Sequence, residues 1–368
     1  METRFTQSIK LFYCYAHEDR YLLEELDRHL SLLKRQYSLV TWGDYEINPG
    51  MEWSKEIDAR LNAAHIILLL ISPSFMASEY CYSVQMKRAL KRHEAGEVSI
   101  IPILLRSVDW TDASFSHLQL LPKGAKPLGS WPDRDKAFSQ VAMSIRLVVE
   151  KQVQLFKQKA GDWNKQGRLL YKQKKYHEAL AAYEQAIFWE ATMNNKAIYC
   201  HNKGDVLYDM KRYDEALEAY EQAINFDSSY AAAYNSIGLV LRDLKRYDEA
   251  LTAFEQAIRT DPHYKWAYRN KGNILRDLGR YDEALEMYDQ AINISPNDEW
   301  SQLTRRIKGD VLRDLKRYDE AIETYEQLLL LNPTHASAYN GKGLALRKIK
   351  LFDEALAAFE QAIQLENN

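Results

Sequence analysis

The chain has 368 residues, of which 46% are apolar and 27% charged, with a formal net charge of −3. This length allows two or three domains that each bury a core, and the composition is that of a globular protein. The charge argues against a nucleic-acid partner. No run of 18 apolar residues and no secretory signal is present, and the three cysteines lack metal or disulfide spacing. We therefore expect a cytoplasmic protein without membrane contact, bound metal or cofactor.

The first 150 residues alternate between strand and helix patterns. Strands are predicted at residues 10–15, 38–42, 66–71 and 99–105, with a short fifth strand at 126–131. Helices are predicted over 19–34, from about residue 53, and after Ser78, which can cap its helix. Apolar strands separated by helices predict a parallel, doubly wound sheet. Pro102 cannot donate a ladder hydrogen bond, so we expect its strand at an edge or a bulge.

Open parallel sheets bind ligands at the carboxyl ends of their strands. The loops expected at that edge cover residues 15–19, 42–50, 72–78 and 106–110. None of them contains GxGxxG, GxxxxGK or GxSxG, which disfavours a Rossmann dehydrogenase, a P-loop enzyme and an α/β-hydrolase. Composition and spacing do not identify the N-terminal domain further.

Residues 151–368 contain six copies of one repeat. YDEAL or a near copy starts at Tyr176, Tyr213, Tyr247, Tyr281, Tyr318 and Phe352, and a glycine precedes each at Gly167, Gly204, Gly238, Gly272, Gly309 and Gly343. Both series step by 37, 34, 34, 37 and 34 residues, and 34 is the period of tetratricopeptide repeats, in which each repeat is a pair of helices. A segment like EQAI follows each YDEAL, and prolines at Pro262, Pro296 and Pro333 mark ends of second helices.

Each repeat position has an expected role. The glycine lets a neighbouring helix backbone approach, the Asp of YDEAL caps the second helix, and its Tyr and Ala-Leu pack inward. The extra three residues of each 37-residue step lengthen a turn between repeats. Continuous helical pattern over residues 138–160 predicts a stiff junction with the N-terminal domain.

Tetratricopeptide arrays usually bind a peptide or protein in their groove, and the partner here is unknown. Four asparagines recur near the glycines, and they either point into the groove or are solvated, turn-adjacent residues: Asn202, Asn235, Asn270 and Asn340. The full lysine-asparagine set that clamps a terminal carboxylate in some families is not found.

Four segments of the N-terminal domain resemble a bacterial Toll/interleukin-receptor (TIR) domain. They are KLFYCYAHEDR, TWGDYEINPGMEW, ILLLISPSFMASEYCYSVQMKRAL and LGSWPDRDKAF. The resemblance spans residues 8–150 in order and spacing. With the repeats, the chain resembles bacterial TIR-tetratricopeptide proteins. This implies a flavodoxin-like α/β parallel-sheet TIR domain at residues 1–150 and an all-α tetratricopeptide superhelix at residues 151–368.

The TIR resemblance implies cleavage of NAD, as substrate, at the nicotinamide-ribose bond. The family uses a glutamate near the ribose, expected four residues after the cysteine of YCY, and here that position is Gln85. A carboxylate stabilises the oxocarbenium-like transition state, and losing its charge costs on the order of 10²–10⁴ in rate. Gln85 is either an engineered replacement or a natural variant with weak or no activity. Glu79 lies about 240° away on an α-helix, so it is not expected to substitute.

The resemblance also implies substrate-binding residues on the loops and an assembly loop that contacts a neighbouring copy. The substrate-binding candidates are Tyr15, His17, Trp42, Asp44, Ser72 and Ser78, and the assembly loop includes Ile47, Asn48, Pro49 and Gly50. Several alternatives stay open: Trp42 as a core residue, Asp44 as a solvated loop residue, and Asp19 as either a helix cap or a nicotinamide contact. Cys81 is expected to pack rather than act as a nucleophile.

The resemblance therefore predicts a bacterial immune or stress effector, such as an antiphage defence protein, whose repeats sense a partner. Its TIR domains self-associate and cleave NAD to ADP-ribose or a cyclic isomer. Two alternatives remain, a non-enzymatic scaffold for protein interactions and a mimic that disrupts host TIR signalling. The trigger and the geometry of assembly are open, as is whether the repeats inhibit or promote assembly.

Overall fold

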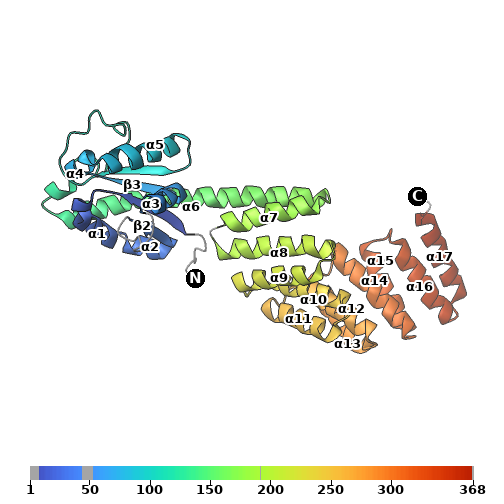
Figure 1. Cartoon of the computed structure of the whole chain (residues 1–368). Coiled ribbons are helices and arrows are strands. Elements are labelled where there is room, and N and C mark those ends of the chain that lie inside the picture. Colours follow the sequence, from blue (N-terminus) through green and yellow to red (C-terminus); the bar gives the residue numbers. More distant parts are fainter. Residues whose placement is uncertain (1–7, 44–52, 191, 367–368) are drawn as a thin grey trace. The chain divides into compact units, whose positions relative to one another are not determined.

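The computed structural model describes residues 8–43, 53–190 and 192–366 (Figure 1). The chain forms two compact units, Met1–Lys196 and Ala197–Asn368. Among the described residues, no helix is both long enough and apolar enough to cross a membrane.

The first unit is built on a parallel sheet of four strands. These are β1 (Ile9–Cys14), β2 (Leu39–Trp42), β3 (Ile66–Ile71) and β4 (Ser99–Leu104), in the order β2-β1-β3-β4. The parallel sheet predicted from the apolar runs is confirmed, with the strand order expected for a flavodoxin-like fold. Among the described strands, β4 pairs with β3 alone, so Pro102 lies in an edge strand, opposite Leu69, as predicted. The outer side of β4 carries an isolated parallel bridge between Ile103 and Leu121.

The fifth strand predicted at residues 126–131 is wrong. The segment Leu128–Ser130 is a 3₁₀ helix instead. Pro127 has no N–H for a ladder, and Gly129 N donates to the carbonyl oxygen of Leu105, the residue after β4, at 2.9 Å.

Helices lie between and beyond the strands of this unit. They are α1 (Arg20–His29), α2 (Ser31–Tyr37), α3 (Trp53–Ala63), α4 (Pro73–Ala77), α5 (Met86–Glu94), α6 (Arg134–Lys172) and α7 (Tyr176–Trp189), with a π-helical segment at Glu79–Gln85. The single helix predicted over 19–34 is wrong, because the chain breaks at Leu30. Its N–H is shared between the carbonyls of Leu26 and Asp27 at 3.1 and 3.2 Å, which ends the regular α-helical ladder.

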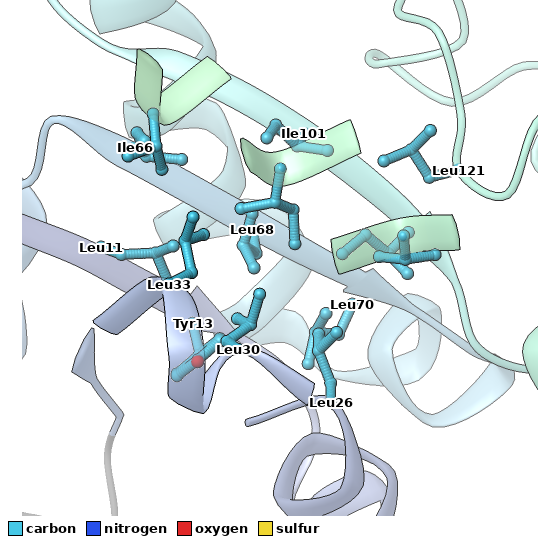
Figure 2. Packing of buried hydrophobic residues seen from close by; sticks show 14 of the residues in the cluster. Leu11, Tyr13, Leu26, Leu30, Leu33, Ile66, Leu68, Leu70, Ile101 and Leu121 are labelled. Atoms are coloured by element: carbon cyan, nitrogen blue, oxygen red, sulfur yellow. The ribbon is translucent and has the colours of Figure 1, made fainter. Parts of the chain in front are cut away.

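Successive residues of β1 face opposite sides of the sheet. Leu11 and Tyr13 belong to a core with α1, α2 and α6, and Figure 2 shows this packing around Leu30, Leu33 and Leu68. The other face of the sheet carries a second core, in which β1 and β3 meet residues of α3, α4 and α5. These two cores fix the carboxyl ends of β1 and β3 beside each other.

Helix α6 continues for 39 residues from the sheet into a helical hairpin with α7. Its buried residues recur every three or four positions from Phe138 to Phe156, so one face lies against the first core along this length. The continuous helix predicted over 138–160 is present. The domain division between residues 150 and 151 stays a prediction.

The remaining helices form pairs of a first helix and a second helix. They are α8 (Met193–Asp209), α9 (Tyr213–Phe226), α10 (Ala231–Asp243), α11 (Tyr247–Thr260), α12 (Lys265–Asp277), α13 (Tyr281–Ile294), α14 (Glu299–Asp314), α15 (Tyr318–Leu331), α16 (Ala336–Lys348) and α17 (Phe352–Glu366). Figure 1 shows α10 to α17 as successive antiparallel hairpins. The second helices α11, α13 and α15 end two residues before Pro262, Pro296 and Pro333, as predicted.

A Cβ on each repeat glycine would meet an aromatic ring, whereas the prediction was a helix backbone. Only at Gly272 is a backbone atom, the carbonyl oxygen of Ala284 at 3.2 Å, also among the nearest atoms. A Cβ built on Gly238 would lie 2.5 Å from Phe254, and one on Gly204 would lie 2.5 Å from Tyr220. Both rings are fully buried. The glycine therefore makes room for a large side chain of the second helix in its own repeat.

Two further expectations about the repeats are wrong. The 37-residue step before Gly309 extends the first helix α14 to 16 residues, against 13 in α12, rather than lengthening a turn. The Asp of YDEAL does not cap its helix. In α11 the helix already begins at Tyr247, and the cap position is Arg246. Arg212, Arg280 and Arg317 hold the same position in other repeats. Asp248 instead lies in the first turn, where a negative charge is favourable. The Ala of the motif is buried in all six copies, as predicted, whereas the Leu position ranges from buried in Leu285 to 59% exposed in Leu356. The leading aromatic is not packed inward in every repeat, since Tyr281 and Phe352 are exposed.

Candidate active site

A cavity of about 480 Å³ opens at the carboxyl ends of β1 and β3. Its lining comes from β1 and the following turn (Phe12, Tyr13, Tyr15, Ala16, His17, Glu18) and from α4 and the π-helical segment (Ser74, Ala77, Ser78, Cys81, Gln85). This is the edge at which open parallel sheets bind ligands, and the volume is that of a small-molecule site.

Gln85 lies at the buried side of this cavity, with 4% of its surface exposed. The thiol of Cys14, the last residue of β1, donates a hydrogen bond to Gln85 Oε1 at 2.9 Å. The Cys14–Gln85 contact joins two segments that are 71 residues apart. An uncharged side chain suits this position, since a buried charge needs a partner.

A serine caps α4, and a second serine caps the π-helical segment that carries Gln85. Ser72 Oγ accepts a hydrogen bond from Phe75 N at 3.0 Å, and Ser78 Oγ accepts one from Cys81 N at 3.3 Å. The cap by Ser78 confirms the prediction. The turns that follow Ser78 are π-helical, so the 100° step used above to separate Glu79 from Gln85 does not apply. Glu79 is nevertheless exposed while Gln85 is buried.

A buried polar network supports the loops around the cavity. Asp19 is fully buried, accepts a hydrogen bond from the Ser72 hydroxyl, and pairs with Arg106 Nε at 2.9 Å. Arg106 also donates from Nη2 to Ser74 Oγ at 2.7 Å. Asp19 makes no side-chain cap to α1. The network thus connects and positions the loops that follow β1, β3 and β4. Asp19 itself is not among the residues that line the cavity.

The predicted site residues fall into three groups. Tyr15, His17, Ser78 and Gln85 line one cavity. Ser72 is fully buried behind it, and Trp42 packs against the second core with the ammonium of Lys10 5.4 Å from its ring centroid. The substrate-binding roles stay predictions for all of them.

The remaining predicted residues, Asp44 and the assembly loop with Ile47, Asn48, Pro49 and Gly50, lie outside the described residues. Within the described part of the chain, no group of three or more His, Cys, Asp or Glu side chains is placed to hold a metal ion.

Sequence reasoning missed Cys14 as the partner of Gln85. The period-two pattern of β1 places Cys14 on the same face as Phe12, toward the helices that carry Cys81 and Met86. That pattern indicates the face but not the contact. Cys81 packs as predicted, and its thiol donates to the carbonyl oxygen of Tyr15 at 3.3 Å.

In the repeats, two of the four recurring asparagines contact each other. Asn270 Nδ2 donates to Asn235 Oδ1 at 2.9 Å, and both side chains are buried between neighbouring first helices. They neither point freely into a groove nor lie in solvent. Asn340, in contrast, is exposed.

Family models match both parts of the chain. A TIR domain model matches residues 11–137, and tetratricopeptide repeat models match residues 163–191, 204–242, 229–297, 265–329 and 308–367. An uncharacterized protein of Sinorhizobium fredii, y4lF, is 46% identical over 136 residues, which cover 37% of this chain. That alignment spans 42% of the relative, so less than half of its length is matched.

Several solved structures resemble about half of the chain. YrrB, described as a protein with an unusual peptide-binding site, is 27% identical, with a TM-score of 0.40 over 47% of this chain and 87% of its own. MamA is 22% identical, with a TM-score of 0.42 over 46% of this chain and 92% of its own. Pseudomonas aeruginosa PilF is 17% identical, with a TM-score of 0.48 over 57% of this chain and 93% of its own. With the family matches, the chain carries an N-terminal TIR domain followed by several tetratricopeptide repeats.

Proposed function

We propose that the TIR domain is of the NAD-cleaving class, and that Gln85 leaves the present chain with weak or no activity. The observation that carries this proposal is the position of Gln85 in the cavity at the carboxyl ends of β1 and β3. TIR domains include NAD-cleaving members, and the resemblance assigns their glutamate to this position.

The chemistry needs a negative charge beside the ribose. As the bond from C1′ to the nicotinamide nitrogen breaks, the bonding pair leaves with nicotinamide and positive charge develops on the ribose. Attack of water, with loss of a proton, then gives ADP-ribose, and attack by an internal nucleophile gives a cyclic isomer. Gln85 can hydrogen-bond ribose hydroxyls but supplies no charge, and its Oε1 already accepts from Cys14.

The proposal assigns regulation to the rest of the molecule. Self-association of TIR domains completes the site through the loop that contains Pro49, and a protein or peptide bound to the repeats controls that association. The output is depletion of NAD or a cyclic nucleotide signal in bacterial immunity or stress.

NAD consumption by the purified chain and by Gln85→Glu tests the proposal at several protein concentrations. The glutamate variant is expected to cleave NAD on the order of 10²–10⁴ times faster, with a rate that rises more steeply than linearly with concentration. Adding Glu79→Gln to this variant is the matched control, and it is expected to leave the rate unchanged because Glu79 is exposed. Equal turnover with and without the carboxylate at position 85 contradicts the assignment.

A second candidate is a scaffold that only self-associates and recruits partners. The neutral, buried pair of Cys14 and Gln85 favours it, because this pair satisfies its hydrogen bond without a substrate. Self-association without NAD cleavage by either form, including at high protein concentration, is the result that selects the scaffold.

A further inference from the structure

The extra turn of α14 creates an aromatic cluster with α12. Trp300 lies in this turn, and its ring meets that of Trp266 edge-on, with centroids 4.6 Å apart. The guanidinium of Arg269 lies over both rings, 4.7 Å from the Trp300 centroid and 5.5 Å from that of Trp266. We call Trp266, Arg269 and Trp300 the tryptophan-arginine cluster.

Arg269 has no acidic partner among the described residues, unlike the other cations of α12. Lys265 pairs with Asp298, Lys271 with Glu255 at 2.9 Å, and Arg276 with Asp277 at 2.8 Å. Arg269 Nε and Nη1 are buried without a hydrogen-bond partner in the described part of the chain. Burial lowers the pKa of Arg269, as expected for a charge that nothing nearby neutralises. Orphaned donors on a cation are costly unless a ligand satisfies them.

The charge around the cluster favours an anionic ligand on the first helices. Helix α12 has four cationic side chains and one carboxylate, whereas the second helix α13 has four carboxylates and no cation. First helices of adjacent repeats also contact each other, as α10 does with α12, so their side chains form a continuous face. Trp300 is 46% exposed on this part of α14 and offers an accessible aromatic surface.

We propose that the tryptophan-arginine cluster binds a side-chain carboxylate of an acidic peptide segment in a partner protein. The guanidinium pairs with such a carboxylate, and its contact with two nearly perpendicular rings holds it in place before binding. The tryptophans then cover the apolar part of the Glu or Asp side chain. The inference rests on the proposed partner-binding role of the repeats, and it does not depend on NAD cleavage.

Fluorescence anisotropy with the full chain and a fluorescein-labelled hexaglutamate peptide tests the inference. We expect saturable binding that weakens with added salt and changes tryptophan emission. Hexaglutamine and a ten-residue oligothymidylate are expected to bind at least about tenfold more weakly. Absence of hexaglutamate binding up to millimolar peptide overturns the inference, and so does tighter binding of the oligonucleotide, which would indicate a nucleic-acid phosphate as the ligand.

Variants separate the cluster from general charge. Arg269→Gln is expected to weaken hexaglutamate binding at least about tenfold, and Arg269→Lys to weaken it less. Arg259→Gln on α11, an exposed position outside the cluster, is the matched control and should bind as the parent does. Unchanged binding by Arg269→Gln, with the helical circular dichroism of the parent, contradicts the inference. Failure of Gln85→Glu to cleave NAD would leave all of these results unaffected.

Discussion

In the TIR domain, polar side chains from distant segments meet at one place, whereas in the repeats one short-range contact recurs along the chain. Ser72 and Asp19 are 53 residues apart, and Cys14 and Gln85 are 71 residues apart. In the repeats, Gly238 meets Phe254 within one helix pair, and Gly309 meets Tyr325 in the same way. A change in the TIR domain should therefore act on a unique network, and a change in a repeat should act locally.

The largest stability effect is expected at Asp19. Asp19→Asn keeps the shape but removes the buried charge that pairs with Arg106, so the free energy of opening around β1 and β3 should fall by about 2–4 kcal/mol. Hydrogen exchange of the β1 and β3 amides measures this value. Glu24→Gln, which changes an exposed pair with Arg20, is the control and should stay within about 0.5 kcal/mol. Equal losses in both variants would show that the buried network does not stabilise the sheet.

His65 should make the stability of the TIR domain depend on pH. Burial lowers the pKa of His65 to about 4, with smaller effects from Lys10, Arg92 and Lys159, and the backbone N–H of Lys10 donates to Nδ1 at 3.1 Å. The unfolded chain binds this proton below pH 6.5 and the folded chain only near pH 4. Stability is therefore fully present above pH 6.5 and falls by roughly 2–3 kcal/mol toward pH 4.

Unfolding by urea at pH values from 4 to 8, for the parent and for His65→Gln, checks this prediction. The difference between the two proteins in how the free energy of unfolding changes with pH is the contribution of His65. Matching pH profiles would contradict a neutral His65 in the folded state.

A smaller effect contrasts two glycines in helices. Gly238→Ala should destabilise its repeat by roughly 1–3 kcal/mol, because the new Cβ meets the buried Phe254 ring. Gly161→Ala in α6 has no heavy atom within 4 Å and should stabilise that helix by about 0.5–1 kcal/mol. Local hydrogen exchange in α10 and α6 measures the two changes. Stabilisation by both substitutions would mean that helix propensity, not ring packing, decides the role of the repeat glycine.

Most of the fold could be predicted from the sequence because its signals are local. The repeat period gave the helix pairs, and four apolar runs gave the four strands. The prediction of a fifth strand at 126–131 overlooked Pro127, which has no N–H for a ladder, and the segment forms a 3₁₀ helix instead. Whether three extra residues extend a helix or a turn depends on packing against the preceding repeat. The repeat period carries no information about that packing.

The candidate site could be predicted only in part. Resemblance marked position 85, and strand order explains why Tyr15, His17 and Ser78 meet it. The hydrogen bond from Cys14 depends on the register that sets Cys14 opposite Leu69, and no local pattern encodes that register.

Hydrogen exchange of the parent chain with and without saturating NAD tests most directly whether the cavity is the nucleotide site. Because Gln85 should slow cleavage, NAD should persist and protect the amides of residues 12–18 and 74–86, which line the cavity. Amides of residues 229–329 in the repeats should exchange as before. Protection confined to the repeats, or no protection anywhere at saturating NAD, would contradict the assignment of the cavity as the NAD site.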